Sequence, residues 1–135
     1  MKLHEAPSPN ARRVHIAMAE KGVEIERVAV DIRGGENISA EYLAKNPGGR
    51  VPMLELDDGT FIGESVSITR YLDAISEGPS LFGDSPLAQA QIDMWQRRAE
   101  FNFLLEVAGA FRNITGFFKD RETCVEAWGV VCADK

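Results

Sequence analysis

A short hairpin signal near the middle of the chain limits what its first half can fold into. Residues 53–56 are mostly apolar, Asp58-Gly59 follows them, and Phe61-Ile62 is apolar again. An Asp-Gly pair accepts the positive φ angles that tight hairpin turns need. The spacing therefore predicts two antiparallel strands in this part of the chain.

Helix-like and strand-like segments alternate on both sides of this hairpin. Before it we expect a strand over residues 2–6, a helix from Asn10 to Gly22, a strand over 25–30 and a helix over 39–45. After Glu64-Ser65, apolar residues recur at helical spacing, namely Ile68, Tyr71, Leu72 and Ile75. A β-α-β opening implies parallel strands, to which the hairpin adds antiparallel ones. The order predicts a thioredoxin-like α/β domain, in which helices cover a mixed four-stranded sheet.

The composition changes at residues 77–86, where two glycines, two prolines and two serines occur in the segment EGPSLFGDSP. Everything after it is helix-like, with Ser85 as an N-cap and Pro86 at the first helical position. We therefore expect a thioredoxin-like domain over 1–77, a linker over 78–86 and a partial all-helical domain over 87–135. The second domain carries more aromatic surface than its helices can bury alone. It is therefore incomplete, leans on the first domain or uses another subunit.

The bulk properties exclude several classes of protein. The net charge of -6 argues against a nucleic-acid binder. No apolar run approaches the roughly 20 residues that span a bilayer, and the first ten residues lack the apolar region of a secretory signal. Only Cys124 and Cys132 occur, without Cys-x-x-Cys or Cys/His ligand spacing. We therefore expect a reduced, cytoplasmic protein that binds no zinc.

Three motifs carry a resemblance to a known family. They are SPNARRV at the start of the first helix, NPGGRVPMLELDDG before the hairpin and ESVSITRYL at the start of the next helix. With these motifs in this order, followed by a helix that contains Met94-Trp95, the chain resembles a cytosolic glutathione S-transferase of the serine-using, bacterial-like kind. The chain ends after only part of the helices that the family has in its second domain. It can therefore be a fragment of a longer protein.

The resemblance implies a glutathione transferase that uses glutathione as co-substrate and needs no metal. Such an enzyme would conjugate the glutathione thiolate to small hydrophobic electrophiles in detoxification, with glutathione-dependent peroxidase activity as a variant. The family implies a cytoplasmic homodimer that binds neither nucleic acid nor membrane. The incomplete helical domain keeps a second interpretation open, a non-catalytic glutathione-binding or dimerisation module without a complete electrophile site.

Ser8 is the candidate donor to the glutathione thiolate. It lies between Pro7 and Pro9 at the mouth of the first helix, where serine-using members of the family carry their catalytic hydroxyl. A hydroxyl there stabilises a thiolate both by a hydrogen bond and through the positive end of the helix. The alternative is that Ser8 only belongs to a proline-rich turn. Asn10 is the rival donor, because it falls where some bacterial members place a cysteine, and its alternative role is a helix cap.

Five residues in two clusters are the candidate glutathione contacts. By the resemblance, Pro52 follows a cis peptide bond, Val51 pairs its backbone with glutathione, and Arg50 meets the glycine carboxylate. Glu64 would hold the γ-glutamyl amine and Ser65 the γ-glutamyl carboxylate, at a helix start whose free N–H groups favour anions. The alternatives are a surface cation for Arg50, a strand-start proline for Pro52 and an ordinary cap for Ser65.

Two further groups of residues are expected to be structural. His4 and His15 have no Cys, Asp or second His at usable spacing, so catalysis by them is not indicated. The apolar stripe around Met94-Trp95 and Phe101 is expected to lie in a core or a subunit interface rather than in an electrophile pocket.

Overall fold

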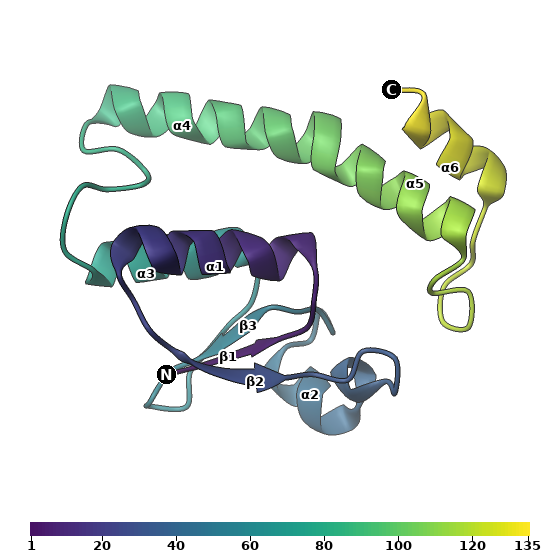
Figure 1. The fold of residues 1–135 in the computed structure, drawn as a ribbon, viewed down its shortest axis with the longest axis horizontal. Helices are drawn as coiled ribbons and strands as arrows, with labels where there is room; N and C mark the ends of the chain where they lie inside the picture. The colour runs from purple at the N-terminus through teal and green to yellow at the C-terminus, as the bar shows by residue number, and fades with distance from the viewer. The chain divides into compact units, whose positions relative to one another are not determined.

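The computed structural model describes all 135 residues and divides them into two compact units, Met1–Phe82 and Gly83–Lys135 (Figure 1). The division falls within residues 78–86, between the last helix of the first unit and the first helix of the second. The first unit combines a sheet with helices, and the second contains helices only.

The first unit is built on a mixed four-stranded sheet. Its strands are β1 (Lys2–Glu5), β2 (Glu26–Ala29), β3 (Met53–Glu55) and β4 (Phe61–Ile62), in the spatial order β2-β1-β3-β4. β1 runs parallel to β2 and antiparallel to β3, and β3 is antiparallel to β4. The parallel pair is joined through a helix, because parallel strands need a crossover connection. The antiparallel pair β3–β4 is joined by a turn in which Gly59 has a φ of 84°. The predicted mixed sheet is confirmed.

Three α-helices flank the sheet. They are α1 (Pro9–Lys21), α2 (Ala40–Lys45) and α3 (Ser65–Ile75), and a 3-10 turn, η1 (Glu36–Ile38), precedes α2. Serine hydroxyls cap the first two: Ser8 Oγ accepts a hydrogen bond from the Ala11 N–H at 3.1 Å, and Ser39 Oγ accepts one from the Tyr42 N–H at 3.2 Å. Each cap satisfies an N–H group that the start of a helix would otherwise leave unpaired.

Two hydrophobic clusters join these layers. α1 and α3 cover one face of the sheet and α2 lies on the other (Figure 1). The cluster under α1 and α3 contains Leu3, Val14, Met18, Leu54, Ile68 and Leu72. The cluster beside α2 contains Val30, Tyr42 and Met53. Neighbouring strand residues point to opposite faces, which is why Met53 and Leu54 belong to different clusters. Ile75, expected on the buried stripe of α3, is 52% exposed, so this stripe ends at Leu72.

The second unit is a long helix followed by a short one. α4 (Pro86–Ala99), the π-helical segment η2 (Glu100–Leu104) and α5 (Leu105–Thr115) follow one another without a break, and α6 (Glu126–Ala133) packs back against α5 (Figure 1). Ser85 caps α4 as predicted, because its Oγ accepts a hydrogen bond from the Ala88 N–H at 3.2 Å. Pro86 takes the first helical position, where its missing N–H costs nothing.

The face that α6 buries differs from the expected one. In the sequence, Cys124, Val125, Trp128 and Val131 recur at helical spacing, a pattern that predicts one apolar face. Trp128 and Val131 are 51% and 47% exposed, whereas Gly129 and Cys132 are buried. A Cβ atom on Gly129 would lie 2.7 Å from Cγ1 of Ile114, so the absence of a side chain lets α6 approach α5 closely. The expectation was wrong because a glycine contributes nothing to a hydrophobic pattern.

Candidate functional site

The pairing of β1 with β3 brings two loops to the same edge of the sheet. His4 at the end of β1 pairs with Met53 at the start of β3. Ser8 lies shortly after His4, and the Val51-Pro52 bond directly precedes Met53. Because the two strands are antiparallel, the loop after β1 and the loop before β3 leave the sheet at the same end.

Ser8 caps α1 and still has a proton to donate. Its Oγ accepts the bond from the Ala11 N–H, which uses a lone pair and leaves the hydroxyl hydrogen free to turn toward another acceptor. The side chain is half-buried at the positive end of a helix of 13 residues. Asn10 is the second residue of that helix, so its alternative role as the cap is wrong.

The Val51-Pro52 peptide bond is cis, and the backbone of Val51 is unused. Neither the N–H nor the C=O of Val51 makes a hydrogen bond within the chain. Unpaired main-chain groups are rare in folded proteins except where water or a ligand takes them. Val51 is half-buried, and its side chain packs against the cluster beside α2. The loop therefore offers the N–H and the C=O of one residue, a donor and an acceptor, to a partner outside the chain.

Polar side chains hold this loop in place. The carbonyl of Arg50 accepts hydrogen bonds from the Tyr42 hydroxyl and from Asn46 Nδ2, both at 2.8 Å. Burial raises the pKa of Tyr42 above its ordinary value, which keeps its hydroxyl protonated as a donor. Asn37 Nδ2 donates to the carbonyl of Gly49 at 2.6 Å. The Arg50 side chain itself is exposed.

Glu64 and Ser65 stand at the start of α3, as the sequence predicted. Glu64 has a φ of 61°, which makes it the only residue other than glycine with a positive φ. Such a conformation is costly for a glutamate and is typical of functional sites. Ser65 is the first helical residue and is 5% exposed. Its Oγ accepts a hydrogen bond of 2.7 Å from Nη1 of Arg13, in α1.

Sequence reasoning missed Arg13 and the side chains that brace the cis-proline loop. Arg13 lies 52 residues from Ser65, and no sequence pattern links the two. Tyr42 was expected only as part of a helix. Asn46 precedes Pro47 and carries the signal of a turn, which gives no hint that its amide holds the Arg50 carbonyl.

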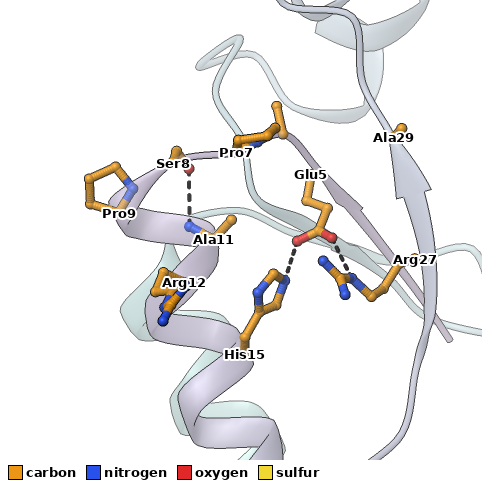
Figure 2. A pocket seen from close by; sticks show the side chains of 10 residues that line it. Glu5, Pro7, Ser8, Pro9, Ala11, Arg12, His15, Arg27 and Ala29 are labelled. Carbon is orange, nitrogen blue, oxygen red and sulfur yellow. Dashed lines mark hydrogen bonds and ion pairs between the residues drawn. The ribbon is translucent and has the colours of Figure 1, made fainter.

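An open pocket of about 750 Å³ lies between α1 and β2, and Ser8 is part of its lining (Figure 2). Figure 2 shows the carboxylate of Glu5 between the side chains of His15 and Arg27. Glu5 is 7% exposed, one of its oxygens accepts from Nε of Arg27 at 2.5 Å, and the other contacts Nε2 of His15. His15 thus has a carboxylate partner that its sequence neighbours did not reveal.

His4 also pairs with a carboxylate. Its Nε2 lies 2.6 Å from Oε2 of Glu55 in the neighbouring strand β3. The hydrogen bond from His4 lowers the pKa of Glu55 below its ordinary value. Both histidines therefore belong to carboxylate pairs that join separate elements of the first unit.

The arrangement suits the binding of an anion or an extended peptide. Ser8 caps the start of α1, and Ser65 is the first residue of α3. Each of these helix starts carries N–H groups without helical partners. Arg13 adds a positive charge beside Ser65. The residues of the first unit therefore provide hydroxyl donors and a cation, which favour carboxylates, and the free main-chain groups of Val51, which favour a peptide backbone.

The family of the chain follows from comparison with known proteins. Residues 7–75 match the family model described as the glutathione S-transferase N-terminal domain. The match covers both helix starts and the cis-proline loop. The chain belongs to the glutathione S-transferase family.

Individual relatives agree with this assignment. Glutathione S-transferase 2 of Saccharomyces cerevisiae is 42% identical over 118 residues, which are 85% of this chain and 51% of that protein. A glutathione S-transferase domain-containing protein from Marinobacter aquaeolei superimposes with a TM-score of 0.95 at 41% identity, over 99% of this chain and 68% of that one. The chain thus spans about half the length of the yeast relative.

A further solved structure contains a ligand. It is a glutathione transferase homologue from Sulfitobacter with bound glutathione, which superimposes with a TM-score of 0.77 at 26% identity. The alignment covers 98% of this chain and 61% of that one.

In this chain itself, no helix combines the length and the apolar character that crossing a membrane requires.

Proposed function

We propose that this protein is a glutathione transferase, which conjugates the thiolate of glutathione to small hydrophobic electrophiles. One observation carries the proposal: Ser8 and Val51, whose N–H and C=O are both unpaired, lie in two loops at the same edge of the sheet. Glutathione is a peptide, so its backbone can take both hydrogen bonds that Val51 offers. Its thiol would then need a donor of the kind that Ser8 supplies. Family membership and the glutathione-bound relative support this ligand.

The remaining polar residues would contact the two ends of glutathione. Val51 would pair with the cysteinyl backbone, and the exposed Arg50 would meet the glycine carboxylate by charge pairing. At the other end, Glu64 would hold the γ-glutamyl ammonium and Ser65 the γ-glutamyl carboxylate. The Arg13 guanidinium bonded to Ser65 would add attraction for that carboxylate.

The role of Ser8 is to make the thiolate available at neutral pH. A free thiol has a pKa near ~8.5, and only the thiolate attacks electrophiles efficiently. A hydrogen bond to the sulfur anion and the positive end of α1 both favour the ionised form. Asn10, the second residue of α1 and two positions after Ser8, is the second candidate donor.

The reaction with an aryl halide balances without a further reactant. The glutathione thiol releases its proton to solvent, and the sulfur forms a bond to the ring carbon. The halide then leaves with the electron pair of the broken bond. The protein contributes orientation and stabilisation of the sulfur anion, which are the contributions that this reaction requires. Reduction of organic hydroperoxides would use the same thiolate.

The proposal includes the cellular location, the oligomeric state and the domain organisation of the protein. We place the enzyme in the cytoplasm as a homodimer that acts in detoxification, with residues 1–77 as the glutathione-binding domain and 87–135 as part of the helical domain. Residues 78–86 would be the linker.

A non-catalytic module is the second candidate, and its basis is the exposed apolar surface of the second unit. Large apolar side chains of α4 and η2 are exposed, such as Trp95 at 63% and Phe103 at 68%. No residue of α4, η2 or α5 is buried. A chain that binds glutathione but presents no finished electrophile site would act in binding or dimerisation only.

Two measurements on the same sample separate these functions. Isothermal titration reports glutathione binding, and conjugation of 1-chloro-2,4-dinitrobenzene reports transfer. Binding with conjugation that is lost in Ser8→Gly supports the enzyme. Binding without conjugation supports the module, and the absence of binding contradicts both. If Ser8→Gly retains turnover while Asn10→Ala loses it, Asn10 rather than Ser8 is the donor.

A further inference from the structure

The pocket between α1 and β2 shares Ser8 with the proposed glutathione site but none of its other residues. Its volume is about 750 Å³, which lies in the range of small-molecule sites. Residues 50–52 and 64–65, the proposed glutathione contacts, do not line it. A molecule in this pocket would therefore have one end at Ser8, the proposed donor to the thiolate, and would extend toward Arg27.

The walls of the pocket divide into an apolar part and a cationic part. Near Ser8 the lining consists of Ala6, Pro7, Pro9 and Ala11. Further away it consists of Arg12, His15, Arg27 and the carboxylate of Glu5. With His neutral, two arginines against one glutamate make a net charge of +1, in a chain whose net charge is -6. The lining of the pocket thus has a net positive charge, although the protein as a whole is acidic.

The one carboxylate in the pocket is not free to repel an anion. Both oxygens of Glu5 are engaged, one by Nε of Arg27 and the other by Nε2 of His15. The bond to Arg27 uses only Nε, which leaves the terminal nitrogens of a side chain that is 59% exposed. Arg12 makes no ion pair, and its side chain is exposed. Glu5 therefore orients Arg27 and His15, while the two guanidinium groups retain donors for a ligand.

We propose that this pocket takes the electrophile, and that the electrophile carries a carboxylate which Arg12 and Arg27 recognise. The apolar body of the substrate lies along the prolines and alanines, and its reacting carbon faces the sulfur at Ser8. A guanidinium matches a carboxylate in charge and in geometry, because its planar fork can form two parallel hydrogen bonds. This inference rests on the proposed transferase function and narrows its substrates to acidic electrophiles.

A matched pair of aryl chlorides tests the charge preference. 4-Chloro-3,5-dinitrobenzoate and its methyl ester present the same reacting carbon, with and without a negative charge. The readout is the ratio of kcat/KM for the acid to kcat/KM for the ester, each divided by its uncatalysed rate with glutathione. We expect the wild type to prefer the acid, and we expect the preference to weaken as salt screens the arginines.

Arg12→Gln is the sharpest variant, because Arg12 is exposed and its removal leaves no buried group unpaired. We expect the acid-to-ester ratio to fall about three- to tenfold, since the contact is charge-assisted but partly open to solvent. Arg12→Glu should reverse the preference. Arg27→Lys retains the charge and should lose less than Arg27→Gln. Lys2→Gln removes an exposed positive charge of the same unit outside the pocket and should leave the ratio unchanged.

Each outcome decides the proposal. A wild-type ratio near one, or a ratio that Arg12→Gln and Arg27→Gln leave unchanged, overturns it while the transferase function stands. If the wild type conjugates neither these probes nor 1-chloro-2,4-dinitrobenzene, the proposed transferase function has failed. The charge preference is then decided by isothermal titration with 3,5-dinitrobenzoate, which lacks a leaving group. Binding that weakens severalfold in Arg12→Gln supports the anion site, and no binding by the wild type overturns it.

Discussion

Arg13 of α1 donates a hydrogen bond of 2.7 Å from Nη1 to Oγ of Ser65, the first residue of α3. The bond joins α1 to the start of α3 through two residues that are 52 positions apart in the chain. Ser65 is 5% exposed, so the bond fixes its hydroxyl and places a guanidinium where the γ-glutamyl carboxylate is proposed to bind. Arg13 thereby connects the helix that carries Ser8 with the helix that would hold the other end of glutathione.

Replacement of Arg13 should weaken glutathione binding. Arg13→Gln removes the charge, and we expect the Kd for glutathione to rise about tenfold, in the range of a hydrogen bond to a charged group. Arg13→Lys should lose less, because the charge remains while the fork geometry is lost. Isothermal titration measures both. Arg33→Gln, at an exposed arginine after β2, is the control, and an equal Kd in Arg13→Gln and the wild type would contradict the role of Arg13.

The two Ser-Pro helix caps allow the capping role of Ser8 to be separated from its chemical role. Ser8 and Ser85 each precede a proline and each accept a hydrogen bond from an alanine N–H. Loss of either cap in an alanine variant should lower the free energy of unfolding by about 1 kcal/mol. Ser8→Gly should cost only a few tenths of that energy, because glycine is itself a tolerated N-cap.

Unlike the free energy of unfolding, the rate of conjugation should depend on the Ser8 hydroxyl and not on helix capping. Ser8→Gly and Ser8→Ala should both reduce kcat/KM for 1-chloro-2,4-dinitrobenzene about a hundredfold, as expected for the loss of a donor to the reacting anion. Ser85→Ala should retain the wild-type kcat/KM. Thermal unfolding and steady-state kinetics on the same preparations give both readouts. If kcat/KM across these variants follows their thermal stability rather than the presence of the Ser8 hydroxyl, the assignment of Ser8 as the thiolate donor is contradicted.

A buried ion pair at the far ends of α1 and α3 should make stability depend on pH. Lys21 Nζ lies 3.0 Å from Oδ1 of Asp73, and the two side chains are 3% and 7% exposed. Burial acts to raise the pKa of Asp73, but hydrogen bonds from the Leu81 N–H, the Ser80 hydroxyl and Lys21 outweigh it and hold this pKa below its usual value. A carboxyl with a lowered folded pKa stabilises the fold above its unfolded pKa, and this contribution disappears as the pH falls through the folded pKa.

Asp73→Asn tests this pair. At pH 7 we expect the free energy of unfolding to fall by about 3 kcal/mol, because a buried lysine loses its partner. The difference from the wild type should begin to shrink below about pH 4, where Asp73 takes up a proton in the unfolded state, and should disappear as the pH falls through the lower pKa of the folded state. Urea unfolding at a series of pH values measures both curves. A difference that is constant from neutral to acidic pH would show that the charge of Asp73 is irrelevant.

The close contact of α5 with α6 should tolerate no side chain at position 129. A Cβ atom on Gly129 would meet Cγ1 of Ile114 at 2.7 Å and Cβ of Asn113 at 2.9 Å. Gly129→Ala should therefore destabilise the second unit by about 1 to 3 kcal/mol. Ile114→Ala, which removes the clashing Cγ1, should make Gly129→Ala less costly than it is in the wild-type background. Hydrogen exchange of α5 and α6 amides reports the effect locally, and unchanged protection in Gly129→Ala would contradict the packing.

The elements that local chemistry defines could be predicted from the sequence. The Asp58-Gly59 turn, the Ser85 cap before α4 and Gly22 at the end of α1 act on residues within one helical turn or one hairpin. Their signals survive in a single sequence because the interacting groups are close along the chain. The apolar alternation that predicts the sheet is local in the same sense.

Side-chain contacts between distant segments could not be predicted. The bond from Arg13 to Ser65, the hydroxyl of Tyr42 on the Arg50 carbonyl and the pairing of His15 with Glu5 join separate elements. Each depends on how helices lie on the sheet, which no local pattern encodes. The buried face of α6 was mispredicted for a related reason, because Gly129 packs through its backbone and leaves no apolar signature.

The ionisation of bound glutathione tests the central claim most directly. The ultraviolet absorbance of the thiolate, titrated against pH with glutathione saturating the protein, gives the pKa of the bound thiol in the wild type and in Ser8→Gly. We expect a pKa about one to two units below the free value of ~8.5 in the wild type, and a return to within a few tenths of that value in Ser8→Gly. An unshifted pKa in the wild type, or an equal shift in both proteins, would contradict the account.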